Sequence, residues 1–87
     1  MPRLEVLSSD MPRAQQEEIL KMAEEVCSRD REEKEKADEL KKECDKKYGP
    51  NWHAVVGKNF GSSSTHEVGT FIFLYVGEQA VQLFKFG

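Results

Sequence analysis

The apolar residues of the first half of the chain recur with the period of a helix. Between residues 12 and 29 they are spaced by three and four, the spacing that one buried helix face requires. The residues of that face are Ile19, Met22, Ala23 and Val26. Asp10 and Pro12 stand where a helix start favours a capping residue and an early proline. The pattern therefore predicts a first helix from about residue 12 to about residue 29.

A second helical pattern follows a run of charged residues. Residues 29–36 contain no apolar residue, which is typical of a solvated connection and of the exposed first turn of the next helix. The second helix then shows a narrow apolar seam, formed by Ala37, Leu40, Cys44 and Tyr48. Gly49 and Pro50 are predicted to end it, because a glycine just past the last turn and a proline cannot continue a helix.

After Pro50 the period changes to two, which indicates strands. Residues 52–56 form one predicted strand, and Leu4, Val6 and Leu7 indicate a short strand at the start of the chain. Residues 71–76 are apolar on both faces, with Phe71, Phe73 and Tyr75 on one and Ile72, Leu74 and Val76 on the other. Such a strand is expected to be central in the sheet and covered on both faces.

The last strand, residues 79–86, is predicted to return beside it through a two-residue hairpin at Gly77-Glu78. The fold class is therefore α+β, with two N-terminal helices packed on an antiparallel sheet.

Composition narrows the class of protein. A chain of 87 residues has room for one domain, residues 1–87, with a core small enough to favour stabilisation by self-association. Two cysteines are too few for a disulfide framework, and neither cysteine nor histidine shows the spacing of metal ligands. The net charge of −3 argues against nucleic acid as a partner. We expect no cofactor, and no secretory leader or membrane span is recognisable.

The segment Gly61–His66 is small and polar and has nothing to bury. One interpretation is a flexible serine-rich loop. The other is an extended strand that is held by pairing with another chain and whose free edge accepts a peptide.

Several motifs resemble the eight-kilodalton dynein light chains. The resembling segments are residues 41–53 (KKECDKKYGPNWH), 56–62 (VGKNFGS), 65–67 (THE), 71–73 (FIF) and 83–87 (LFKFG). The likeness runs without gaps over residues 38–87. Over residues 1–37 it lies mainly in the matching length and placement of the helices.

The resemblance implies a strand-swapped homodimer. In this family the strand around residues 60–66 crosses over and pairs with the partner's sheet, and its outer edge receives a target peptide. Targets resemble a Thr-Gln-Thr core, and one target is the dynein intermediate chain. The expected function is a dimeric adaptor in the cytoplasmic dynein motor complex on microtubules, with no enzymatic activity. A dimerisation clamp that works independently of the motor, for diverse or membrane-cytoskeleton partners, is the alternative.

The site residues also follow from the resemblance. The peptide-binding residues it implies are Glu33, Lys34, Asn59, Phe60, Gly61, Ser62, Ser63, Ser64, Thr65, His66, Phe71, Phe73 and Tyr75. The dimer-interface residues it implies are Trp52, His53, Val56, Lys58, Phe60, Ser62 and Ser63. Protonating a self-facing His53 places like charges together, so we expect acid to weaken the dimer.

The chain departs from the family pattern at several positions. Ser63 and Ser64 replace a tyrosine and a valine, which removes contact area and predicts a weaker dimer or a shifted peptide preference. Lys36 is charged and Gln82 is polar where relatives commonly carry apolar residues. An enzyme would require a nucleophile and a base such as Cys44 and His53 or His66, but Cys44 is expected on the buried seam of a helix, where a small hydrophobe is the commoner explanation.

Overall fold

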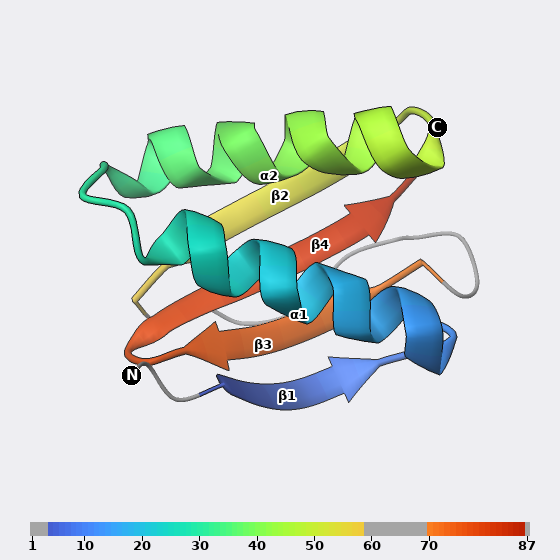
Figure 1. The fold of residues 1–87 in the computed structure, drawn as a ribbon, viewed down its shortest axis with the longest axis horizontal. Coiled ribbons are helices and arrows are strands. Elements are labelled where there is room, and N and C mark those ends of the chain that lie inside the picture. The colour runs from blue at the N-terminus through green and yellow to red at the C-terminus, as the bar shows by residue number, and fades with distance from the viewer. Residues whose placement is uncertain (1–3, 59–69, 87) are drawn as a thin grey trace.

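The computed structural model describes residues 4–58 and 70–86 (Figure 1). The elements in chain order are β1 (Leu4–Ser9), α1 (Arg13–Cys27), α2 (Glu33–Tyr48), β2 (Trp52–Gly57), β3 (Ile72–Val76) and β4 (Gln79–Lys85). The two helices and the described strands fall close to the predicted ranges. The first helix is shorter than predicted at both ends.

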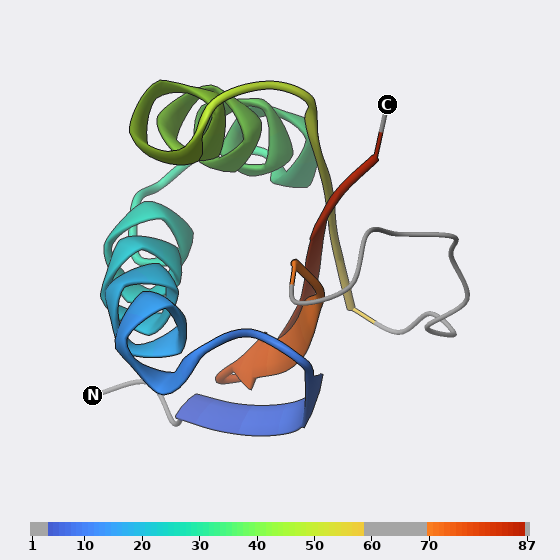
Figure 2. The same ribbon diagram turned by 90° about the vertical axis from the view of Figure 1, so that its right-hand side faces the viewer.

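The four strands form one antiparallel sheet in the order β1-β3-β4-β2. Both helices lie against the same face of this sheet, which Figure 2 shows from the side. We call this the helix face and the opposite side the outer face. The predicted α+β class with two helices on an antiparallel sheet is therefore confirmed, as is the central place of the strand rich in phenylalanine. The strand swap concerns a second chain and stays a prediction.

The core lies between the helices and the helix face of the sheet, because the apolar side chains of both layers point toward it. Its largest fully buried side chains are Trp52, Ile19, Leu40, Ile72, Leu74, Leu83, Val81 and Cys44. Ile72, Leu74 and Val76 of β3 belong to this core, as do Val81 and Leu83 of β4. The intervening residues form a second apolar cluster on the outer face, made of Phe71, Phe73 and Ala80 with Tyr75 and Phe84 packed against it.

Asp10 has a different role from the predicted helix cap. Pro12 occupies the N-cap position of α1, and that position makes no side-chain capping hydrogen bond within the described residues. The carboxylate of Asp10 instead accepts a hydrogen bond of 2.8 Å from the backbone N–H of Phe71, and the N–H of Asp10 donates to the Phe71 carbonyl at 3.1 Å. The aspartate therefore ties the end of β1 to the start of β3. A hydrogen bond between residues 61 positions apart leaves no local signal in the sequence.

The two predicted turns are confirmed. Gly49 follows α2 with a φ of 81°, a left-handed conformation that glycine adopts without strain. Gly77 has a φ of 61° and opens the turn between Val76 and Gln79, which pair across the hairpin.

Asp45 connects α2 to the start of β2. One carboxylate oxygen accepts from the Lys41 ammonium at 2.6 Å, and the other accepts from the Trp52 N–H at 2.8 Å. The hydrogen bond from Lys41, and then that from Trp52, hold the pKa of Asp45 below its ordinary value. A carboxyl group with a lowered pKa stabilises the fold above its unfolded pKa of about 4, and this contribution disappears as the pH falls through the folded pKa.

We expect Asp45→Asn to lower the free energy of unfolding at pH 7 by on the order of 1 kcal/mol and to flatten its pH dependence below about pH 4. Urea unfolding at pH 7, 4 and 2.5 measures both effects. Asp38→Asn is the matched control, because Asp38 pairs with Lys42 at 3.0 Å with a side chain 58% exposed. Equal pH profiles for the wild type and Asp45→Asn would contradict the assignment.

Candidate functional site

The edge of β2 is the first feature of the candidate site. Within the described part of the chain, β2 pairs with a strand on one side only, β4. Its other edge presents a row of backbone N–H and C=O groups, which is the surface that an added strand uses. β1 is the opposite edge, and it is interrupted by an irregularity between Val6 and Ser8. A bulge of this kind makes an edge a poorer template for pairing.

Two side chains of β2 reach the outer face beside that edge. His53 is exposed; its Nε2 lies 3.1 Å from the Phe86 carbonyl oxygen, and its ring stacks on Phe84 at 5.2 Å between centroids. Val55 follows on the same face and is 42% exposed, and Phe86, whose carbonyl contacts His53, is 49% exposed. The outer face therefore offers uncovered apolar area next to a titratable ring.

Trp52 and Val56 do not belong to this surface. Trp52 is fully buried in the core, and Val56 packs against the same core. Because strand residues alternate between faces, both side chains point toward the helices when His53 points away. The assignment of both residues to a dimer interface stays a prediction. The alternation also indicates Val55, which the sequence analysis missed. Lys58, just beyond β2, is exposed.

The start of α2 holds the next two predicted residues. Glu33 is the first residue of the helix, Lys34 is the second, and both are exposed. Glu32, at the N-cap position, makes no capping hydrogen bond with its side chain. Amide N–H groups at a helix start have no partner within the helix and carry partial positive charge, so they suit an oxygen atom of a ligand. A cavity of about 670 Å³ adjoins this end and is lined in part by Glu33, Lys36, Lys58 and Gln79.

Lys36 lies in the wall of that cavity and is only 7% exposed. Its ammonium donates to the Cys27 carbonyl at 3.0 Å and to the Gln79 side-chain oxygen at 2.8 Å. The Gln79 side-chain N–H donates to the same Cys27 carbonyl at 3.2 Å. Cys27 is the last residue of α1, where carbonyl groups lack helical partners and a cation is favourable. Lys36, which departs from the family pattern, thus acts as a buried C-terminal cap of α1.

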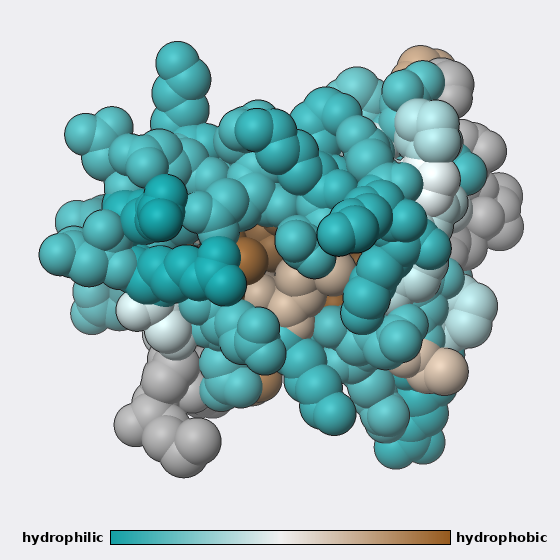
Figure 3. All heavy atoms as spheres, turned by 45° about the horizontal axis from the view of Figure 1, so that its top comes forward, coloured by the Kyte–Doolittle hydropathy of each residue, from teal (hydrophilic) through white to brown (hydrophobic). Residues whose placement is uncertain are grey.

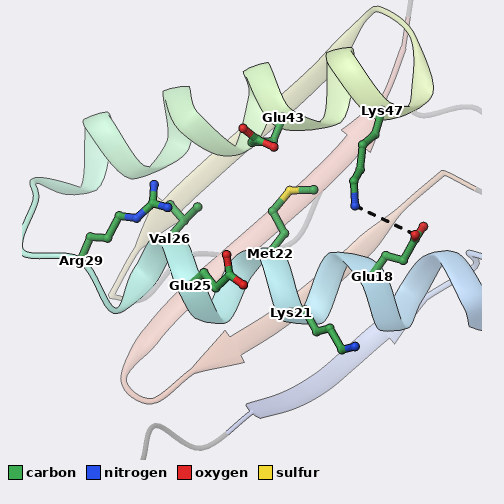
Figure 4. A pocket seen from close by; sticks show the side chains of 8 residues that line it. All are labelled: Glu18, Lys21, Met22, Glu25, Val26, Arg29, Glu43 and Lys47. Atoms are coloured by element: carbon green, nitrogen blue, oxygen red, sulfur yellow. Dashed lines mark ion pairs between the residues drawn. The ribbon is translucent and has the colours of Figure 1, made fainter.

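A second pocket lies between the two helices. Figure 3 shows a small apolar area surrounded by hydrophilic side chains, and Figure 4 shows the pocket between the two helices. Its volume is about 400 Å³, and it is lined by Glu18, Lys21, Met22, Glu25, Val26, Arg29, Glu43 and Lys47. Lys47 and Glu18 form an ion pair of 4.0 Å across it. Its three acidic and three basic side chains balance, so it favours neither charge in a ligand.

The chain resembles known proteins over almost its whole length. A family model described as "Dynein light chain type 1" matches residues 3–86. The protein "Dynein light chain 1, cytoplasmic" of Candida glabrata is 44% identical over 85 residues, which cover 98% of this chain and 99% of that protein. Its namesake from Debaryomyces hansenii is 45% identical over 80 residues, covering 92% and 88% of the two chains. The chain belongs to the dynein light chain type 1 family.

A solved structure has the same fold. The dynein light chain-like domain of a Fasciola hepatica calcium binding protein superimposes with a TM-score of 0.84, at 20% identity and with 99% of this chain and 93% of that one covered. The family model and the two relatives confirm the family resemblance inferred from residues 38–87, and the match extends through the N-terminal helices. Membership in this light chain family also confirms the prediction of a protein that is not an enzyme.

The described residues of this light chain bring the predicted site only partly together. Phe71, Phe73 and Tyr75 lie on one face of the sheet, as predicted, and His53 lies on that same outer face. Glu33 and Lys34 lie at the start of α2. Outside the described residues lie the other predicted peptide-binding residues, Asn59, Phe60, Gly61, Ser62, Ser63, Ser64, Thr65 and His66. The binding role of every one of these residues stays a prediction.

Cys44 and His53 are separated by the sheet. The Cys44 side chain is fully buried in the core on the helix face, and burial, with the neighbouring acidic groups Asp45 and Glu43, raises the pKa of its thiol to about 12. A protonated, enclosed thiol is a poor nucleophile. Among residues 4–58 and 70–86, no cluster of histidine, cysteine and acidic residues could hold a metal ion, and no helix is long and apolar enough to cross a membrane.

Proposed function

We propose that this light chain is a cytoplasmic homodimer that binds short linear peptides by β-strand addition and serves as an adaptor in the dynein complex. The observation that carries the proposal is the free edge of β2 beside an outer face with exposed and aromatic side chains. The relatives named as cytoplasmic dynein light chain 1 support the cellular setting. The dynein intermediate chain, with its extended motifs, is the expected target.

Strand addition would use two kinds of contact. Backbone hydrogen bonds between an added strand and the sheet supply affinity that depends little on sequence, and side-chain pockets supply selectivity. In our proposal the segment 60–66 of the partner pairs beside β2, and its other edge receives the peptide. Phe71, Phe73 and Tyr75 would form the apolar floor, since they share one face of the central sheet.

The start of α2 would read one side chain of the peptide. A glutamine at the centre of a Thr-Gln-Thr motif carries a carbonyl oxygen, which suits the amides of Glu33 and Lys34 at the helix start. The side chain of Glu32, at the N-cap position, makes no capping hydrogen bond within the described residues. The proposal therefore predicts that an alanine in place of that glutamine weakens binding.

Calorimetry with a Thr-Gln-Thr peptide, run beside a measurement of oligomeric mass, tests the proposal. We expect a dimer that binds two peptides, and an affinity at least about tenfold lower for the matched Thr-Ala-Thr peptide, as for loss of a hydrogen-bonding group. Val55→Glu places a charge on the exposed apolar area of the outer face, so we expect it to yield a folded monomer. A monomeric wild type with no detectable peptide binding would overturn the proposal.

A further inference from the structure

Gln82 is a buried polar residue in apolar surroundings. It lies in the middle of β4 and is 4% exposed. Its neighbours Val81 and Leu83 point into the core, so alternation places Gln82 on the outer face. It pairs with Phe73 of β3 and with Val55 of β2.

Among the residues that the structure describes, the side-chain oxygen of Gln82 has no hydrogen-bond partner. Its neighbours on the outer face of the described sheet are Val55, Phe73, Ala80 and Phe84, by strand pairing and by alternation along β4. None of these side chains carries an N–H or O–H group. A buried carbonyl oxygen left without a donor is costly, and such groups are rare in folded proteins. The missing donor must therefore come from outside this set of residues.

We propose that a second copy of this chain supplies that donor and that Gln82 determines the specificity of the dimer. This inference rests on the proposed function, which brings a second chain to the β2 side of the outer face. Gln82 lies one strand away from the free edge, next to the exposed Val55. A second copy docked there would cover the apolar area and reach the carboxamide. A partner with only apolar groups at this point would leave the oxygen unpaired and bind less well.

Sedimentation over a concentration series compares the wild type with Gln82→Met, which keeps length and flexibility but loses the carboxamide. We expect the dimer dissociation constant to rise about tenfold, as for loss of one hydrogen bond within an interface. Gln82→Leu should show a similar rise, because the effect depends on the amide and not on shape. An unchanged or lower dissociation constant in Gln82→Met would overturn the inference and leave the proposed function intact.

Two further readouts separate this role from a merely structural one. In dilute solution, where the chain is monomeric, Gln82→Met should be at least as stable to urea as the wild type, because the lost oxygen has no partner in the described part of the protomer. The side-chain amide resonances of Gln82 in a ¹⁵N spectrum should shift as the dimer forms.

Other outcomes are equally informative. A loss of affinity for the Thr-Gln-Thr peptide with an unchanged dimer constant would assign the donor to the peptide and overturn the dimer role. A wild type that remains monomeric at millimolar concentration would overturn both this inference and the proposed function.

Discussion

Trp52→Ala is expected to lower the free energy of unfolding by about 3–5 kcal/mol, the usual cost of truncating a buried aromatic residue to alanine. Trp52 is fully buried at the start of β2, and its ring lies 5.8 Å from that of Tyr48 between centroids. Small domains have a total stability at the lower end of about 5–15 kcal/mol. The variant should therefore be largely or wholly unfolded at 37 °C, as circular dichroism during heating will show.

Trp52→Phe is the informative control. The indole N–H of Trp52 has no hydrogen-bond partner within residues 4–58 and 70–86. Phenylalanine keeps most of the buried apolar volume and removes that N–H, so the cost should stay below about 1.5 kcal/mol. Leu7→Ala, at a side chain 46% exposed, should cost less than about 1 kcal/mol. All variants should be compared at several protein concentrations, because dimerisation would raise apparent stability. A small loss in Trp52→Ala would contradict the central place of this side chain.

The second large effect is expected at the buried contact between Lys36 and Gln79. Gln79→Leu removes the acceptor that lies 2.8 Å from the Lys36 ammonium and leaves the buried charge with the Cys27 carbonyl. Hydrogen bonds to charged groups contribute about 1.5–3 kcal/mol, so we expect a loss of that size in urea unfolding. Adding Lys36→Met should restore most of it, because an apolar pair of similar volume often replaces a buried charge without cost.

A double-mutant cycle isolates this interaction. The coupling between Lys36→Met and Gln79→Leu should be at least about 1 kcal/mol, since the two side chains are in direct contact. Lys46→Met is the matched control, because Lys46 lies exposed on the same helix, and it should show no coupling to Gln79→Leu. Additive losses in the Lys36 and Gln79 variants would mean that the two residues act independently and would refute the buried cap.

Periodic features of the sequence predicted most of the fold. The spacing of Ile19, Met22 and Val26 located α1, and the change of period after Pro50 located the strands, because both signals depend on residues close in the chain. Placement of single side chains was less successful. Asp10 was assigned to a helix end that Pro12 occupies, and the exposed Val55 on the outer face was not singled out.

The candidate site depended on both sources. The likeness of residues 41–87 to dynein light chains was sufficient for the family and for the expected peptide groove, because that segment carries closely spaced motifs. The likeness did not explain the roles of Lys36 and Gln82; it showed only that both are polar where relatives commonly carry apolar residues. Lys36 reaches a carbonyl nine residues earlier and an amide 43 residues later. The side-chain oxygen of Gln82 lacks a donor within the described residues because its cross-strand neighbours, Val55 of β2 and Phe73 of β3, are apolar.

The sequence by itself therefore determined the elements, their buried faces and the family, since these follow from short-range periodicity and local motifs. Only the tertiary structure decided which edge of the sheet remains free, which face carries His53 and Val55, and why Lys36 tolerates burial. These properties arise where segments distant in the chain meet. No local pattern encodes them, because each partner satisfies a hydrogen bond or a contact that exists only after the sheet and helices have packed.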